Sequence, residues 1–201
     1  TAAVRTDGEK YGAAAFENVY APINDPLGPV PEDTLELRVR RDHVPYDVWQ
    51  RKGLIYTTEG NVIHYAFIEK FIERLGERFN IREIAFDRWG AVQMVQNLEG
   101  MGFTVVPFGQ GFKDMSPPTK ELMKLTLEKR IAHGGHPVLH WMMDNVYVRT
   151  DPAGNVKMDK EKSTEKIDGA IAMIMALDRG DLDWREVMNP RSEYNQKHKS
   201  Y

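Results

Sequence analysis

The stretch from residue 63 to residue 107 limits the fold most strongly, because its hydrophobic pattern alternates between helical and extended spacing. Apolar residues recur every three to four positions over 63–79, which predicts an amphipathic helix. A short apolar run at 81–86 predicts a strand, a second helical pattern follows to Gly102, and 103–107 predicts another strand. Two strands joined through a helix need a crossover connection, which favours parallel pairing. We therefore expect an α/β domain with a mixed central sheet flanked by helices.

The N-terminal half adds strands and a charged helix to this unit. Two strands are expected within 2–20 around the turn Asp7-Gly8, which is a strong hairpin signal. A helical stretch is expected to start at Pro31, and a short strand is expected at 54–58. The second helix of the central stretch is expected to carry its apolar side chains on one side: Val92, Val95, Leu98 and Met101.

The C-terminal half is expected to be mainly helical. Ser116-Pro117-Pro118 resembles a helix start with a serine cap, and that helix should run to about Arg130. A short helix is expected at 138–145, a β-hairpin at 146–158, and a strongly amphipathic helix at 167–177. We expect one domain at 1–180 and a C-terminal extension at 181–201 that begins with a separate short element and is partly frayed.

Composition excludes several classes of protein. The chain has 201 residues, enough for one domain with a real core, and 41% of them are hydrophobic against 28% charged, which is typical of a globular protein. No run approaches the roughly 20 apolar residues that cross a bilayer. The absence of cysteine excludes disulfides, thiolate nucleophiles and cysteine-ligated zinc. A net charge of -3 argues against a globally basic nucleic-acid binder but leaves room for a local basic patch.

Two aspartates stand where the expected secondary structure changes. Asp87 ends the strand at 81–86, and Asp168 opens the late amphipathic helix. Carboxylates at the end of a strand and on the first turn of a helix can converge over a sheet, where hard divalent cations find oxygen ligands. A metal-dependent phosphodiester chemistry is one interpretation of this pair. The other is structural: Asp87 caps the following helix, and Asp168 stabilises its own helix through the helix dipole.

Basic residues close to the two aspartates are candidates for phosphate contacts. Arg88 follows Asp87, while Lys160, Lys162 and Lys166 precede Asp168. These cations could bind phosphate or balance crowded carboxylates, and the alternative is an ordinary solvated charge run.

The histidines offer a competing zinc site. His136, His140 and Asp144 are spaced four residues apart, so they would share one face of a helix, and His133 lies just upstream. The pattern lacks the glutamate of a His-Glu-x-x-His motif, and the helix would have to start before Pro137, so the sequence favours the carboxylate pair over zinc.

Seven short motifs, taken in order, resemble the C-terminal nuclease domain of the large terminase subunit of tailed bacteriophages. The resemblance extends from the first residues to about Gly180. The motifs are Val30-Pro-Glu-Asp-Thr34, Arg40-Arg-Asp-His-Val-Pro-Tyr-Asp-Val-Trp49, Gly60-Asn-Val-Ile63, Ile84-Ala-Phe-Asp-Arg-Trp89, Val106-Pro-Phe-Gly-Gln-Gly-Phe112, Ser116-Pro-Pro-Thr-Lys-Glu-Leu122 and Lys166-Ile-Asp-Gly169.

The resemblance implies a ribonuclease H-like fold and cutting of concatemeric viral double-stranded DNA during genome packaging in the host bacterial cytoplasm. It makes Asp87 and Asp168 the matching catalytic acids and ligands of Mg²⁺ or Mn²⁺ in a two-metal site. In such a site, Lys162 or Lys166 would help to hold the phosphate, a role that we assign from their proximity to Asp168 in the sequence. It also implies partners in the full assembly: an N-terminal ATPase domain, the small terminase subunit and the portal.

One acid of the resembled family has no counterpart in this chain. That acid lies on the first strand, just upstream of a Thr-Ala pair that aligns with Thr1-Ala2, so we expect the first strand to be absent here and cleavage by this chain to be weak. Two other functions stay open. One is a non-catalytic module that docks to portal or DNA, and the other is a nuclease of the resolvase or integrase type.

Overall fold

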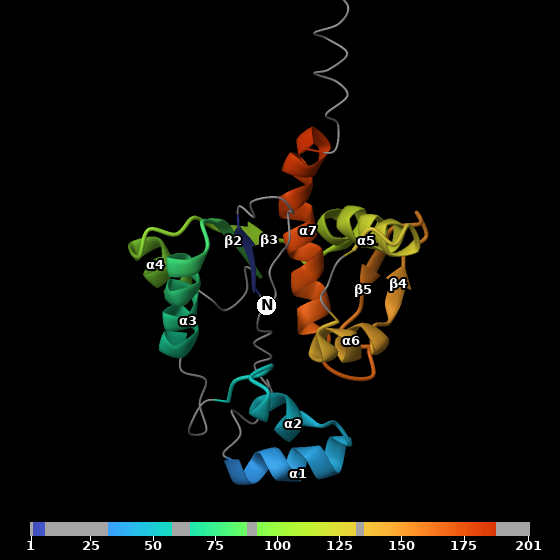
Figure 1. Ribbon diagram of the computed structural model, residues 1–201. Coiled ribbons are helices and arrows are strands. Elements are labelled where there is room, and N and C mark those ends of the chain that lie inside the picture. The colour runs from blue at the N-terminus through green and yellow to red at the C-terminus, as the bar shows by residue number, and fades with distance from the viewer. Residues whose placement is uncertain (1, 7–31, 58–64, 88–91, 132–134, 188–201) are drawn as a thin grey trace, which may run out of the picture.

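A computed structural model describes residues 2–6, 32–57, 65–87, 92–131 and 135–187 of the chain (Figure 1). Its central sheet has three strands in the order β1 (Ala2–Thr6), β2 (Ile81–Asp87) and β3 (Val105–Phe108). β1 is antiparallel to β2, and β2 is parallel to β3. The expected mixed α/β arrangement is therefore confirmed, as is the first of the two N-terminal strands. The second expected strand, after Asp7-Gly8, lies outside the described residues.

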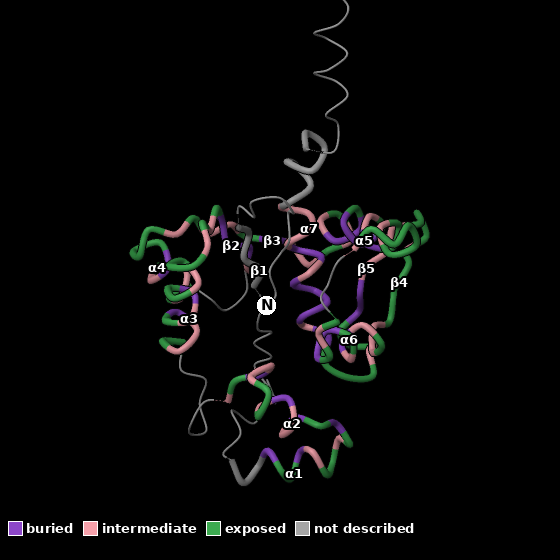
Figure 2. The backbone as a smooth tube through the Cα atoms, viewed as in Figure 1, coloured by how far each residue is buried: buried purple, intermediate pink, exposed green. Residues whose placement is uncertain are grey.

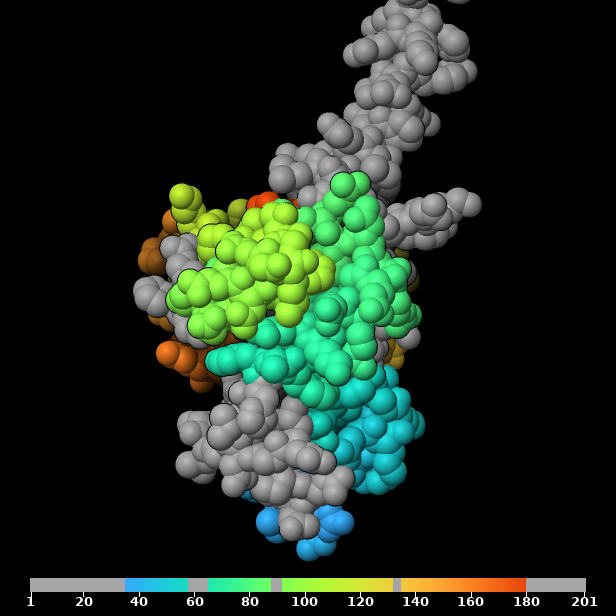
Figure 3. All heavy atoms as spheres, turned by 90° about the vertical axis from the view of Figure 1, so that its left-hand side faces the viewer, coloured from blue at the N-terminus to red at the C-terminus, as the bar shows by residue number. Residues whose placement is uncertain are grey.

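Two helices pack on one face of this sheet, and they form the side of the molecule that faces the viewer in Figure 3. They are α3 (Tyr65–Arg78) and α4 (Val92–Gly100), and α4 makes the expected crossover between the parallel strands. Ile84 at the centre of β2 is fully buried between Ile72 of α3 and Leu98 of α4. Burial of branched aliphatic side chains on this face holds the two helices against the sheet.

The apolar side of α4 is only partly where the sequence placed it. Met94 and Leu98, one turn apart, pack toward the sheet, whereas Val92 is 70% exposed and Met101 is 45% exposed. Val92 is six residues before Leu98, which is about 120° around a helix, and Met101 lies beyond the last helical residue, Gly100. The expectation was wrong for these two residues.

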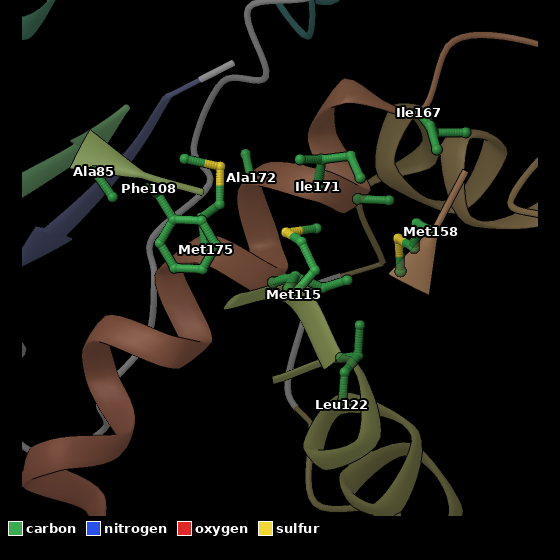
Figure 4. Close-up of a cluster of buried hydrophobic side chains, with 11 residues drawn as sticks. Ala85, Phe108, Met115, Leu122, Met158, Ile167, Ile171, Ala172 and Met175 are labelled. Atoms are coloured by element: carbon green, nitrogen blue, oxygen red, sulfur yellow. The ribbon is translucent and has the colours of Figure 1, made fainter. Parts of the chain in front are cut away.

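The other face of the sheet is covered by α7 (Asp168–Val187), which packs in turn against α5 (Phe112–Leu127). Their shared core is rich in methionine and isoleucine (Figure 4). The buried residues of α7 lie in its first half, between Gly169 and Met175 (Figure 2). α7 runs through Gly180 to Val187 as one helix, so no separate short element starts at 181.

Helix α5 begins five residues earlier than expected, because its cap is Gly111 and not Ser116. Pro117 and Pro118 lie inside the helix. Ser116 is not the cap: its side chain is buried, and its Oγ accepts a hydrogen bond at 3.1 Å from the backbone N–H of Val156. A proline inside a helix loses one backbone hydrogen bond, and the tertiary packing of α5 outweighs that local cost.

The remaining elements form a second core and a hairpin. Helices α1 (Glu32–Asp42) and α2 (Tyr46–Arg51) share a core with α6 (Pro137–Asp144). The rings of Tyr46, Trp49 and Trp141 contact one another there at centroid distances of 5.8, 6.0 and 5.5 Å. The expected hairpin is confirmed as β4 (Val148–Thr150) and β5 (Val156–Met158).

The short strand expected at 54–58 is wrong. Residues 54–57 form no strand, and Ile55 is 3% exposed within the core of α1, α2 and α6. Its apolar character serves that core rather than a sheet. Among the described residues, no helix is long and apolar enough to cross a membrane.

Candidate functional site

Asp87 lies on the face of the central sheet that α7 covers. Side chains alternate between the two faces of a strand, so Glu83, Ala85 and Asp87 of β2 share one face. Glu83 accepts a bidentate hydrogen bond from Arg179 of α7, with Nη2 and Oε2 3.0 Å apart. Ala85 is 2% exposed and belongs to the core formed by α7. Both neighbours on this face therefore contact α7, and Asp87 continues the same row.

The two contact points also fix the direction of α7 along β2. Glu83 lies beside Arg179, and Ala85 belongs to a core whose α7 members all precede Arg179, so the helix runs back toward its start as the strand runs toward its end. From Glu83 to Asp87 the strand advances about 13 Å, at about 3.3 Å per residue. From Arg179 back to Asp168 the helix covers about 16 Å, at about 1.5 Å per residue. Asp87 and Asp168 are thereby brought to the same end of the sheet.

Asp168 is the first residue of α7 and has a lysine at its carboxylate. The Lys160 Nζ lies 2.6 Å from Asp168 Oδ1, and the side chains are 43% and 22% exposed, respectively. The pair is partly open to solvent. A carboxylate at the start of a helix also interacts favourably with the helix dipole, so the structural role that the sequence left open for Asp168 is compatible with its position.

The other basic candidates take different places. The Lys162 Nζ lies 5.4 Å from the centre of the Tyr147 ring, and Lys166 is exposed just before α7. Arg88 lies outside the described residues. Sequence reasoning noted Lys160 only as one of three lysines, because a charge run does not show which member reaches the aspartate.

Buried Asp159 organises the turn that carries Lys160. Its Oδ1 accepts hydrogen bonds from the backbone N–H groups of Glu161 and Lys162, at 3.0 and 3.3 Å. Burial opposes ionisation of this carboxyl group, but the backbone hydrogen bonds and the positive charge of Arg149 outweigh it and hold its pKa below the usual range. No sequence pattern marks this residue, since a lone aspartate after a strand is not distinctive.

The histidines that the structure describes do not assemble a zinc site. His136 caps α6, with its Nδ1 accepting from the backbone N–H of Leu139 at 3.4 Å. His140 and Asp144 form an exposed pair, 3.4 Å apart. His133 lies outside the described residues. Within the part of the chain that the structure describes, no three acidic, histidine or cysteine side chains form a group that could hold a metal ion.

Comparison with known proteins gives a consistent result at the level of sequence. The family model for the terminase large subunit, endonuclease domain, matches residues 26–182. The terminase large subunit of Enterobacteria phage HK97 is 44% identical over 149 residues, which are 73% of this chain and 30% of that protein. Protein YmfN of Escherichia coli (strain K12) is 31% identical over 149 residues, 73% of this chain and 33% of that protein.

A solved structure is also similar. The crystal structure of the HK97 bacteriophage large terminase matches with a TM-score of 0.68 and 43% sequence identity, covering 74% of this chain and 32% of that one. The chain thus spans about a third of the length of the relatives it matches.

Proposed function

Because this chain belongs to the terminase large subunit endonuclease domain family, we propose that it is the DNA-cutting part of a viral packaging enzyme, with a ribonuclease H-like fold. Its substrate would be concatemeric viral double-stranded DNA. The observation that carries the proposal is the placement of Asp87 and Asp168 at one end of the sheet, on the face that α7 covers. The mixed sheet with helices on both faces supports the fold assignment.

Asp87 and Asp168 would hold Mg²⁺ or Mn²⁺, which prefer carboxylate oxygens. The ammonium group of Lys160 lies against Asp168, which supports the proposal that a cation can approach this carboxylate. When bound, the metal ions would supply an activated water and stabilise the leaving oxygen. The chain's own residues would position these ions, while Arg88, Lys162 and Lys166 are proposed phosphate contacts.

A third carboxylate is part of this proposal. Ala2 pairs with Phe86, so the N-terminal end of β1 lies at the same end of the sheet as Asp87. A residue before Thr1 could therefore reach the site, in agreement with the resemblance that places the third acid there. Metal binding and cleavage by residues 1–201 alone would then be weak.

The surroundings of this activity are likewise proposals. In the full assembly the domain would act with a terminase ATPase domain, a small terminase subunit and the portal, in the cytoplasm of a bacterial host. The length of the relatives, about three times that of the matched region, leaves room for the ATPase domain.

Nicking of supercoiled plasmid DNA in Mn²⁺ tests the proposal. The substrate DNA would be incubated with this chain and with a form extended upstream by the residues that precede Thr1. We expect weak nicking from the first and stronger nicking from the second, in both cases lost in Asp87→Asn and in Asp168→Asn. The matched control is Glu73→Gln, which removes an exposed carboxylate from α3 on the far side of the sheet. Nicking that survives Asp87→Asn would contradict the proposal.

A non-catalytic docking module is the second candidate. It is favoured by the finding that the described residues provide two carboxylates at this place and no group of three. The extended form separates the two functions. If the domain only docks, the extended form should nick DNA no more than the shorter chain does. Retained binding to DNA or portal would then support the docking function.

A further inference from the structure

Lys160 is placed on Asp168 by a turn that is itself tightly constructed. We call residues 159–163, between β5 and α7, the lysine turn. Its backbone closes through Ser163, whose Oγ donates to the carbonyl of Asp159 at 2.6 Å. The same Oγ accepts from the backbone N–H of Tyr147 at 3.1 Å, which attaches the turn to the start of the β4–β5 hairpin.

The β4–β5 hairpin also contacts Asp159, the first residue of the turn. Arg149 lies 3.5 Å from the carboxylate of Asp159, which is 5% exposed. The Asp159 N–H donates to the carbonyl of Tyr147 at 2.9 Å. The backbone of Lys160 is thus fixed by its neighbours, whereas its side chain is a flexible four-carbon stem with its ammonium partly in solvent.

The contact has a direct electrostatic consequence. At 2.6 Å the ammonium neutralises part of the charge of Asp168 and occupies one side of Oδ1. A divalent cation at the same carboxylate would meet both the loss of that contact and repulsion from the lysine. We propose that Lys160 is a built-in competitor for the cation at Asp168. A phosphodiester oxygen offers the lysine another anionic partner, so DNA would relieve the competition and couple cation binding to substrate binding.

The inference rests on the proposed function, because it assumes that Asp168 is a cation ligand. It differs from a general charge effect, and the chain provides the control for that difference. Lys162, two residues away on the same turn, carries the same charge but lies over the Tyr147 ring. Removing either ammonium changes the net charge by the same amount. Only removal of the Lys160 ammonium breaks the contact between this turn and Asp168.

Cation binding can be followed without cleavage. Mn²⁺ would be titrated into ¹⁵N-labelled protein, and paramagnetic broadening of the Gly169 amide signal would report occupancy at the start of α7. The variants are Lys160→Met, Lys160→Arg, Lys162→Met and Asp168→Asn. Broadening of this kind detects millimolar binding, which suits a site with two of its carboxylates.

We expect Lys160→Met to bind Mn²⁺ about two- to fivefold more tightly than the unchanged chain, the range set by partly exposed ion pairs. In the absence of DNA, Lys160→Arg and Lys162→Met should bind Mn²⁺ about as tightly as the unchanged chain, and the gain in Lys160→Met should shrink as salt is raised. A short DNA duplex should tighten Mn²⁺ binding more in the unchanged chain than in Lys160→Met, because the coupling passes through the lysine.

The outcomes separate the two proposals. Equal affinities for Lys160→Met and the unchanged chain, with binding lost in Asp168→Asn, would overturn the competitor role and leave the proposed function standing. An equal gain in Lys160→Met and Lys162→Met would also overturn it, in favour of general charge. Broadening that persists in Asp168→Asn, or none in any variant, would contradict both proposals.

Discussion

The two faces of β2 are built from alternate residues of one short sequence and do different things. The face toward α3 and α4 carries Ile84, which is fully buried among aliphatic side chains. The face toward α7 carries Glu83, Ala85 and Asp87 in succession. Only the middle one is small and apolar; the outer two are carboxylates, one paired with Arg179 and one at the end of the strand.

This difference shows how a strand can support a fold and a candidate site together. The aliphatic face contributes stability through burial, while the α7 face uses the Glu83–Arg179 pair as a fixed point from which Asp87 is placed. Loss of an aliphatic side chain should therefore weaken the domain, and loss of Asp87 should leave it folded.

Truncation of the aliphatic face should have the largest effect on stability. Ile84→Ala removes a fully buried side chain from contact with Ile72 and Leu98, and we expect a loss of about 2–5 kcal/mol in the free energy of unfolding. Urea denaturation followed by circular dichroism measures it. A loss below that of an exposed substitution such as Val92→Ala would show that this face does not support the fold.

Breaking the Glu83–Arg179 pair on the α7 face should reduce the free energy of unfolding by a smaller amount. Arg179→Met leaves Glu83, with a side chain 11% exposed, without its guanidinium, and we expect a loss of about 1–3 kcal/mol. Glu83→Gln and the double variant complete a double-mutant cycle by urea denaturation. Additive losses in that cycle would mean that the two side chains do not stabilise each other.

Mild acid should destabilise the α7 side of the sheet and leave the side covered by α3 and α4 unchanged. Burial lowers the pKa of His136 below its ordinary value of 6.5, so the unfolded chain binds a proton more readily than the folded one. Stability from this group is full above pH 6.5 and is lost as the pH falls through that value toward the lowered pKa. Protonation of Nδ1 also removes the acceptor that caps α6. Helix α6 contacts the start of α7 through Met142, whose Sδ lies 3.1 Å from the backbone nitrogen of Gly169.

Hydrogen exchange between pH 7.5 and 5.5, corrected for intrinsic rates, measures this effect. Protection should fall in α6 and the first turn of α7 and hold in α3 and α4. His136→Asn keeps a side-chain cap without titrating, so its protection should not change with pH. The exposed His140→Asn is the control and should behave like the unchanged chain. Equal loss of protection on both sides would contradict a local effect of His136.

Neutralising Asp87 should have the smallest effect on folding. Asp87→Asn keeps the shape of a half-buried side chain at the end of β2, and we expect a change of less than about 1 kcal/mol in unfolding free energy. A stability loss as large as that of Ile84→Ala would favour the structural interpretation of this residue.

The elements that sequence reasoning found are those with strong local signals. The periodic run before β2, the strands β2 and β3, the β4–β5 turn and the start of α7 all follow from local patterns. The errors occur where tertiary packing decides. Ile55 has the apolar character of a strand residue but packs in a helical core, and Ser116-Pro117-Pro118 lies inside a helix because packing outweighs its proline cost.

The candidate site divides in the same way. Asp87 and Asp168 stand at element boundaries, which a sequence reveals, and the resemblance to a family adds their role. The partner of Asp168 depends on a turn that two contacts attach to the β4–β5 hairpin. Tyr147 contacts Ser163, 16 residues away, and Arg149 contacts Asp159, 10 residues away, and no local pattern relates these residues. Arg179, 96 residues beyond Glu83, is likewise visible only in three dimensions.

A crystal of this chain soaked in Mn²⁺ tests the central claim most directly, with anomalous diffraction recorded above the manganese edge. We expect a peak within coordination distance of carboxylate oxygens of both Asp87 and Asp168, with the Lys160 ammonium moved away from Asp168. Absence of a peak, or a peak bound to only one of the two aspartates, would contradict the claim that they form one cation site.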